Sequence, residues 1–186
     1  MDFPIRDGWR YAAAVDTETT GLDSNARVVQ VAALRFRWRR SDPNGLPEFQ
    51  ASTAMRLVSL VRPPHGTWFN PAAVRVTGID ARKVAGAPVF TDLAARFLEV
   101  CDGLPIVAHN ASFDRRMIDG EFGRLGMRSP EATRWFCSMG LARRTGQITA
   151  KLGDLCCRLA IEPDGELHDA GTDALLAARV TAHLFS

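Results

Sequence analysis

The stretch AAAVDTETTGLD, residues 12–23, decides how the rest of the chain is interpreted. Its first half is a short apolar run that ends at Val15 and is typical of a buried strand, and two acids, Asp16 and Glu18, follow directly. Because alternate side chains of a strand share one face, these carboxylates should lie side by side. Adjacent carboxylates raise each other's pKa unless a cation lies between them, and hard oxygen ligands favour Mg²⁺ or Mn²⁺. For an isolated D-x-E, a solvated strand end would be the simpler explanation.

The hydrophobic pattern around this stretch predicts an α/β protein. Three strands joined by turn-like segments come first and suggest an antiparallel meander, and strands then alternate with helices, which predicts a mixed sheet covered by helices. The polar segment 37–55, with DPNG at its centre, is expected to be a loop insertion. Strands are expected at 11–16, 28–36, 54–63, 104–110 and 134–138, and helices at 70–78, 89–101, 113–126, 151–160 and 170–184.

Length and composition are those of one ordinary globular domain. The chain has 186 residues, 46% hydrophobic residues and a net charge of +2, so residues 1–186 are expected to form a single domain and charge alone identifies no partner. The four cysteines form no C-x-x-C and have apolar neighbours, which favours buried free thiols. No targeting segment and no apolar run of about 20 residues is visible. We therefore expect a soluble, cytoplasmic protein.

Two further segments carry acids in positions that could meet the first pair. In AHNASFD, residues 108–114, a strand runs into His109 and Asn110, and Asp114 falls in the first turn of the next helix. The helix dipole alone favours an acid there, and turn hydrogen bonds would explain the other two residues. In HDAGTDA, residues 168–174, His168 and Asp173 are about 500° apart on a helix, so they converge only if His168 lies in the loop before it.

Taken together, the three segments predict a phosphoryl-transfer site. Four acids and one histidine suit two metal ions, held roughly 3.5–4 Å apart, that clamp the attacking and leaving oxygens. A histidine with an unperturbed pKa of about 6.5 can take a proton from water near neutral pH. A mixed sheet would bring the acids together at the carboxyl ends of its parallel strands.

The segments V-D-T-E-T-T-G-L, H-N-A-S-F-D and H-D-A-G-T-D-A resemble the three motifs of the DEDDh family of 3′–5′ exonucleases. That family includes the proofreading epsilon subunit of bacterial DNA polymerase III and RNase T. The segment VRVTGID, residues 74–80, is similar to the family's V-x-G-I element. The resemblance extends from about Tyr11 to Leu184, in the family's order, and so covers nearly the whole chain.

The resemblance implies an RNase H-like fold, a five-stranded mixed sheet flanked by helices whose second strand is antiparallel to its neighbours. It implies that the metal-binding acids are Asp16, Glu18, Asp114 and Asp173, and that His168 is the general base. By similarity, Asp16 would bridge two Mg²⁺ or Mn²⁺ ions. Glu18 and Asp173 would coordinate the ion that activates water, and Asp114 would coordinate the other ion. The terminal nucleotide would contact Thr19, Leu22, Asn110 and Phe113. Gly171 departs from the larger apolar residue of many relatives, and we expect a looser start to the last helix.

The expected function is metal-dependent 3′–5′ exonuclease activity on the 3′ end of single-stranded nucleic acid, with DNA preferred and RNA left open. The alternative is a non-autonomous proofreading subunit that acts through a DNA polymerase partner. Because the sequence ends at Ser186, just after the last expected helix, a stand-alone enzyme is favoured. A catalytically inactive nucleic-acid binder and a phosphatase of small phosphates are weaker alternatives, because all five catalytic-type residues are present and three ordered motifs match.

Aromatic and basic residues outside the three motifs give less specific expectations. Trp68 could stack on a base, although packing explains it more simply. Arg35, Arg37 and Arg39 would share one face of a strand and could contact a nucleic-acid strand, although a solvated surface is the default explanation.

Overall fold

A computed structural model describes residues 3–42, 45–130 and 134–185, and its centre is a mixed β-sheet. The strand order is β4-β3-β2-β5-β6, and β1 pairs with β2 outside this path. The pairs β2–β3 and β3–β4 are antiparallel, whereas β2–β5 and β5–β6 are parallel. The five main strands thus confirm the expected mixed sheet and the antiparallel meander at its start. The strands are β1 (Ile5–Arg6), β2 (Trp9–Thr19), β3 (Val28–Arg39), β4 (Glu48–Leu60), β5 (Ile106–Ala108) and β6 (Trp135–Cys137).

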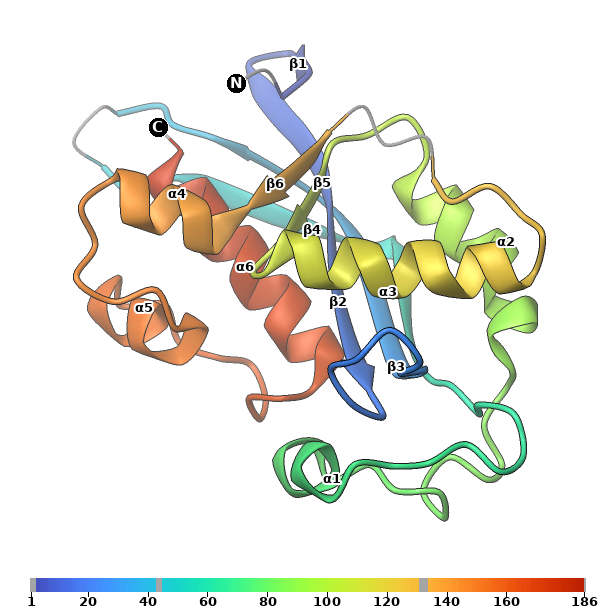
Figure 1. Ribbon diagram of the computed structural model, residues 1–186. Coiled ribbons are helices and arrows are strands. Elements are labelled where there is room, and N and C mark those ends of the chain that lie inside the picture. Colours follow the sequence, from blue (N-terminus) through green and yellow to red (C-terminus); the bar gives the residue numbers. More distant parts are fainter. Residues whose placement is uncertain (1–2, 43–44, 131–133, 186) are drawn as a thin grey trace.

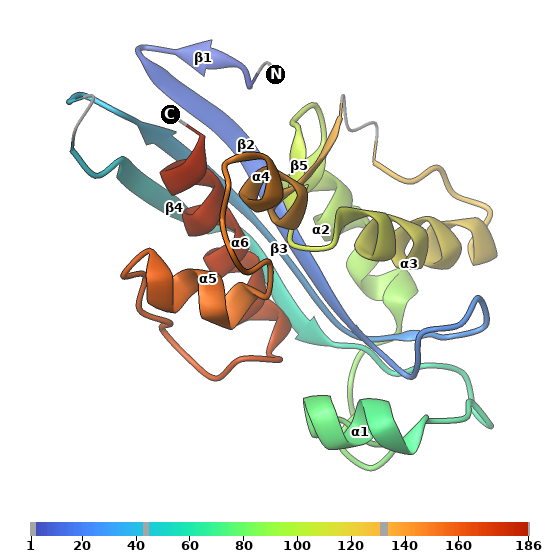
Figure 2. The ribbon, with the colours of Figure 1, turned by 60° about the vertical axis from the view of Figure 1, so that its left-hand side comes forward.

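Helices cover both faces of the sheet (Figures 1 and 2). In Figure 2, α2 and α3 lie on one side of the strands, whereas α4, α5 and α6 lie on the other. The short helix α1 is capped by Asn70 at its start and by Gly78, with φ 64°, at its end. The helices are α1 (Pro71–Thr77), α2 (Phe90–Cys101), α3 (Ala111–Arg124), α4 (Ser138–Arg144), α5 (Leu152–Arg158) and α6 (Ala170–Leu184).

The central strand β2 is apolar because it is buried on both faces. Ala13 and Val15 belong to the core under α2 and α3, whereas Ala12 and Ala14 face the alanines of α6 on the other side. Small side chains on both partners let α6 approach the sheet closely. This alternation fixes the directions in which the residues after Val15 point.

The start of α6 is tightly packed, contrary to the looseness expected at Gly171. A Cβ atom at Gly171 would lie 3.1 Å from Val58 Cγ1 and 3.1 Å from Asp169 Oδ1. The residue itself is buried against β4. A Cβ atom here would require its neighbours to shift by a few tenths of an ångström, so a glycine suits the close approach of the helix to the sheet.

The expectation of a loop over residues 37–55 is wrong. β3 continues to Arg39 and β4 begins at Glu48, with Arg37 opposite Gln50 in the ladder. The connection is therefore limited to residues 40–47, of which 43–44 lie outside the described residues. The polar composition is misleading because Phe36 and Trp38 are buried on one face while arginines alternate with them on the other.

Strand β4 forms one edge of the sheet, and an arginine from α2 reaches it. Arg96 Nη2 donates hydrogen bonds to the backbone carbonyl oxygens of Ala54 and Arg56. At the opposite edge, β6 has only three residues. Neither β1 nor α4 was predicted from the sequence.

The four thiols are free, but their burial differs from the expectation. Cys101 and Cys156 are buried as expected, Cys137 is half-buried, and Cys157 is exposed because it lies on the solvent side of the short helix α5. None of the helices formed by the described residues has the length and apolar character needed to cross a membrane.

Candidate active site

A cleft of about 900 Å³ lies where β2 and β5 end and where α3 and α6 begin. The parallel pairing of β2 with β5 brings their carboxyl ends to the same edge, as the sequence predicts. The acids and the histidine of the three motifs all line this cleft: Asp16, Glu18, Asp114, His168 and Asp173.

Asp114 is tied directly to the strand that carries the first two acids. The backbone N–H and the hydroxyl of Thr17 both donate to Asp114 Oδ1, at 3.0 and 2.9 Å. Asp114 is 3% exposed, and the start of α3 holds its backbone. Thr17, which stands between Asp16 and Glu18 in β2, therefore holds the carboxylate of Asp114 in place. The sequence did not reveal this role of Thr17.

His168 and Asp173 come together in the way that their spacing requires. His168 lies in the loop before α6, and its backbone N–H donates to Asp173 Oδ2 at 3.1 Å. The backbone φ of His168 is 64°, a left-handed conformation that is costly for a residue with a side chain. Such strain persists where the surrounding structure imposes it. Here a ligand atom of His168 lies within 4.8 Å of those of Glu18 and Asp173.

The first turn of α6 is fixed to strand β3 by Gln30. Gln30 Nε2 donates to Asp169 Oδ2 at 2.6 Å, and the backbone N–H of Ala170 donates to Gln30 Oε1 at 3.2 Å. Asp169 Oδ1 in turn accepts from the N–H of Thr172 at 3.1 Å and caps the helix. Gln30 lies 139 residues from Asp169, and no local sequence pattern indicates this contact.

Burial and mutual repulsion raise the pKa values of the clustered acids. Burial, followed by the charges of Asp173 and Asp114, raises the pKa of Glu18 to about 8. Burial raises the pKa of Asp114 to about 7 although the hydrogen bonds from Thr17 lower it. The pKa of Asp16 is raised well above its usual range by burial and by the neighbouring acids. Without a cation, these carboxyl groups therefore hold protons at pH values where ordinary carboxyl groups are ionised, and a bound cation would displace those protons.

The donor set suits a divalent cation. Asp173 Oδ1 is buried and, among the described residues, has no hydrogen-bond partner, which is unusual for a carboxylate oxygen. Glu18, His168 and Asp173 each offer one ligand atom, and these atoms lie within 4.8 Å of one another. A Mg²⁺ or Mn²⁺ ion would bind these carboxylate oxygens and would give Asp173 Oδ1 the partner that it lacks.

Three of the four predicted substrate-contacting residues line the cleft: Leu22, Asn110 and Phe113. Leu22 is 74% exposed, and its carbonyl oxygen accepts a 3.0 Å hydrogen bond from Arg116 Nη2. Thr19 does not line the cleft. Its side chain is buried and donates to the carbonyl oxygen of Gly21 at 2.6 Å, so it shapes the turn that presents Leu22.

The far wall of the cleft comes from residues 148–154, which sequence reasoning did not include. His109 holds this wall: its Nε2 lies 2.7 Å from the carbonyl oxygen of Ala150, and its Nδ1 lies 2.9 Å from Ser138 Oγ. Burial lowers the pKa of His109, which favours a neutral ring in this position. His109 thus links the end of β5 to a wall that carries Lys151.

A buried ion pair supports the loop between β2 and β3. Glu121, which is 2% exposed, receives two 2.7 Å hydrogen bonds from Arg27 and one of 3.4 Å from Arg124. Bidentate pairs of this kind fix geometry strongly.

Beyond this loop, Trp68 is 65% exposed, so core packing does not explain its position.

Comparison with known proteins indicates the same class of protein as the fold and the clustered acids do. The family model described as Exonuclease, RNase T, matches residues 13–181. The DNA polymerase III subunit epsilon of Salmonella typhimurium is 32% identical over 179 residues, which cover 89% of this chain and 68% of that protein. Exonuclease X in complex with 5′ overhanging duplex DNA superimposes with a TM-score of 0.68 at 25% identity, covering 94% of this chain and 90% of that one. The zinc-ion-bound form of Escherichia coli Exonuclease I with single-stranded DNA gives 0.71 at 20% identity, with 94% and 40% coverage.

The class that fold and comparisons define is that of the DEDD 3′–5′ exonucleases, enzymes that hydrolyse phosphodiester bonds and use divalent metal ions. The chain belongs to the RNase T exonuclease family and is related to the epsilon subunit of DNA polymerase III and to Exonuclease X. The resemblance seen in the sequence is thereby confirmed.

Proposed function

We propose that this protein removes nucleotides from the 3′ end of single-stranded DNA by a two-metal mechanism in which His168 is the general base. The observation that carries the proposal is the convergence of Asp16, Glu18, Asp114 and Asp173 with His168 around one cleft. The sequence order and spacing of these residues match the family's motifs. We further propose that residues 1–186 act as a single exonuclease domain in the cytoplasm, which four free thiols suit.

The proposed metal ligands are the four acids, with Mg²⁺ or Mn²⁺ as the ions. The unpartnered Asp173 Oδ1 and the raised pKa values of Glu18 and Asp114 support this assignment. When bound, two such ions would stabilise the charge that develops on the phosphoryl group and lower the pKa of a water molecule. Thr17 and Gln30 would keep Asp114 and the start of α6 in position through their hydrogen bonds.

His168 would accept the proton of the attacking water on an imidazole nitrogen. Its side chain is exposed to the cleft, and its backbone N–H is held by Asp173, so the ring can lie next to the acids while remaining in contact with solvent. Leu22, Asn110 and Phe113 would bind the terminal nucleotide. The exposed Leu22 and the ring of Phe113, with the Arg116 guanidinium 5.4 Å from its centroid, provide apolar and cationic surface for a base and a phosphate.

The decisive experiment is a degradation assay with 5′-labelled oligonucleotides. Matched DNA and RNA, single- and double-stranded, are incubated with the full chain and Mg²⁺, Mn²⁺ or EDTA. The proposal expects progressive shortening from the 3′ end of single-stranded DNA with metal, and none with EDTA or with Asp16→Asn. A wild-type protein that leaves every oligonucleotide intact, or that hydrolyses only mononucleotides, would contradict it.

A polymerase partner is the second candidate, and the epsilon relatives favour it. In this case the chain would act mainly as a proofreading subunit and would turn over free oligonucleotides slowly. Co-elution with the catalytic subunit of the replicative polymerase of the same cell, together with faster excision of a mismatched 3′ end in the mixture, would support this role. No co-elution and full activity of the chain alone would favour a stand-alone enzyme.

A further inference from the structure

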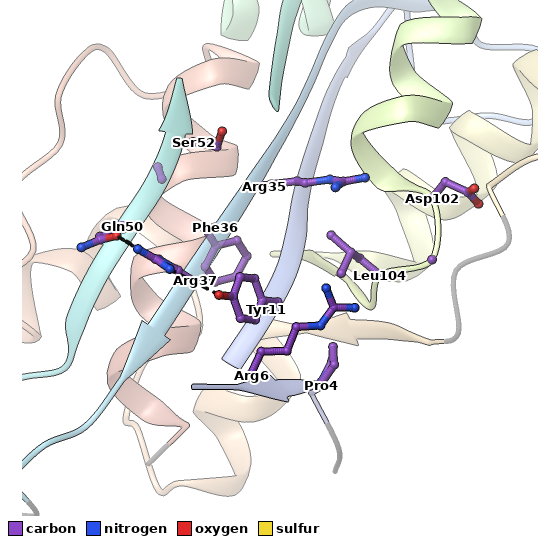
Figure 3. Close-up of a pocket in the computed structure, with 12 residues that line it drawn as sticks. Pro4, Arg6, Tyr11, Arg35, Phe36, Arg37, Gln50, Ser52, Asp102 and Leu104 are labelled. Carbon is purple, nitrogen blue, oxygen red and sulfur yellow. Dashed lines mark hydrogen bonds between the residues drawn. The ribbon is translucent and has the colours of Figure 1, made fainter. Parts of the chain in front are cut away.

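A second pocket, of about 570 Å³, lies at the opposite end of β2 from Asp16 and Glu18. Strand β1, the beginning of β2, the β3–β4 hairpin and the turn after α2 surround it (Figure 3). Its size falls in the range of small-molecule sites, about 300–1,000 Å³. The lining residues that matter for its chemistry are Arg6, Tyr11, Arg35, Arg37 and Leu104.

The pocket is separate from the catalytic cleft. Tyr11 and Asp16 lie five residues apart on β2, which places them roughly 17 Å apart along the strand. An odd separation also puts their side chains on opposite faces of the sheet. Tyr11 therefore shares the face of Ala13 under α2, whereas Asp16 shares the face of Ala14 under α6.

The pocket carries positive charge that the described residues do not neutralise. Arg35 donates to the carbonyl oxygens of Val100 and Glu99, at 2.9 and 2.7 Å, which leaves Nη1 without a partner among the described residues. Arg37 donates to Gln50 Oε1 and, at 3.3 Å, to the hydroxyl of Tyr11. These acceptors are neutral, so they do not compensate the positive charge of the two guanidinium groups.

Arg6 is the most informative lining residue, because neither helix capping nor strand pairing accounts for the position of its side chain. Among the described residues its guanidinium makes no hydrogen bond and no ion pair, yet it extends toward Leu104 beside Tyr11 in Figure 3. Asp102 is the one acid among the described lining residues, and its carboxylate points away from the three arginines in the same view. Arg6 thus offers five free N–H donors next to an apolar and aromatic surface.

We propose that this pocket binds a nucleotide, with its terminal phosphate between Arg6 and Arg35 and its base against Tyr11 and Leu104. Planar guanidinium forks match the oxygens of a phosphate, and the tyrosine ring can stack on any base. The nucleotide is either a free nucleoside monophosphate or the phosphorylated 5′ end of a strand, which present the same chemistry. This site goes beyond the proposed exonuclease function, because its residues are remote from the catalytic acids.

The test is calorimetric titration of the full chain with dAMP, AMP and inorganic phosphate in EDTA. EDTA removes the metal ions that would hold a phosphate in the catalytic cleft, and dependence on Arg6 assigns the remaining binding to the second pocket. The expected result is one site for dAMP or AMP, a weaker affinity for inorganic phosphate, and about tenfold weaker nucleotide binding in Arg6→Ala. Arg82→Ala is the matched control, because Arg82 is also exposed and its side chain makes no hydrogen bond or ion pair among the described residues, and this variant should bind as the wild type does.

A second titration distinguishes the two sources of the phosphate. Short oligonucleotides with and without a 5′ phosphate are compared on the wild type and on Arg6→Ala. Arg6-dependent binding of the phosphorylated strand, without binding of dAMP or AMP, would support the strand end as the ligand. The proposal is overturned if no nucleotide or phosphorylated strand binds, if Arg6→Ala binds as tightly as the wild type, or if an aspartate-rich peptide binds through Arg6 as tightly as dAMP. All these measurements are independent of hydrolysis.

Discussion

Thr17 and Asp114 are joined by two hydrogen bonds, 2.9 Å from the hydroxyl and 3.0 Å from the backbone N–H, although 97 residues separate them in the sequence. Both bonds end on the same carboxylate oxygen. They connect the strand of the first motif to the helix of the second. They also oppose the effect of burial on the pKa of Asp114, which is nevertheless raised to about 7.

The Thr17→Val variant should therefore bind metal more weakly near neutral pH. Loss of the hydroxyl removes one hydrogen bond to the charged form, and the pKa of Asp114 should rise further. A charge-assisted hydrogen bond contributes about 1.5–3 kcal/mol, so we expect about tenfold more Mn²⁺ for half-maximal activity at pH 7. The defect should shrink at pH 9, where the carboxyl group ionises in both proteins. Thr17→Ser keeps the hydroxyl and is the control. An equal defect at both pH values would indicate a packing effect instead.

The metal-free protein should lose stability as the pH rises from 6 to 9. The pKa of Glu18 is about 8 in the folded protein and about 4.5 when unperturbed, so the folded state holds its proton more tightly. Stability from this group is complete below the lower value and is lost as the pH passes through about 8. Asp114 acts in the same direction.

The Glu18→Gln variant isolates this contribution. In EDTA at pH 9 it should be more stable than the wild type by about 1–2 kcal/mol, a value reduced because Glu18 is partly exposed and the other acids remain. At pH 5 the two proteins should differ little. Thermal unfolding followed by circular dichroism measures both. Added Mn²⁺ at pH 9 should reverse the order, because the wild type binds the ion more tightly. Parallel pH profiles in EDTA would disprove the assignment.

The left-handed backbone at His168 predicts a difference between two inactive variants. With φ at 64°, glycine should be tolerated better than alanine, and His168→Gly should be more stable than His168→Ala by about 1 kcal/mol. Both variants should lose activity by the same factor, about 10²–10⁴, because both lack the proposed base. Urea unfolding and single-turnover rates provide the two measurements. If alanine proved the more stable replacement, the backbone at this position would not be strained.

The buried carboxylate of Glu121 should be far more important for stability than a surface acid on the same helix. Glu121→Ala leaves Arg27 partly buried without its partner and should cost about 3 kcal/mol. Asp119→Ala removes an exposed pair with Arg115, at 3.5 Å, and should cost no more than about 0.5 kcal/mol. Chemical denaturation of both variants makes the comparison. Similar losses would mean that the Arg27 pair does not stabilise the loop after β2.

The residues that carry the chemistry could be found from the sequence, because the family's motifs name them and a mixed sheet brings their segments to one edge. The five-residue spacing of His168 and Asp173 even predicted the loop before α6. Residues that hold the motifs could not be found in this way. Thr17 and Gln30 act on carboxylates 97 and 139 residues away, and no local pattern encodes such pairs.

The error over residues 37–55 has a similar physical origin. An edge strand exposes much of its surface, so the composition of β4 resembles that of a loop, and the burial of Trp38 depends on α6 and the chain end near Phe185. Cys157 was misassigned because the solvent-facing side of a seven-residue helix is not evident from apolar neighbours.

The contact of Arg96 with β4 has a consequence for solubility. An open sheet edge presents backbone groups that can pair with another chain, and the thirteen residues of β4 form the long edge of this sheet, whereas β6 is too short to offer much. Arg96 occupies two of those carbonyl oxygens and adds a positive charge beside them. We therefore expect this one side chain of α2 to disfavour pairing of the middle of β4 with another copy of the protein.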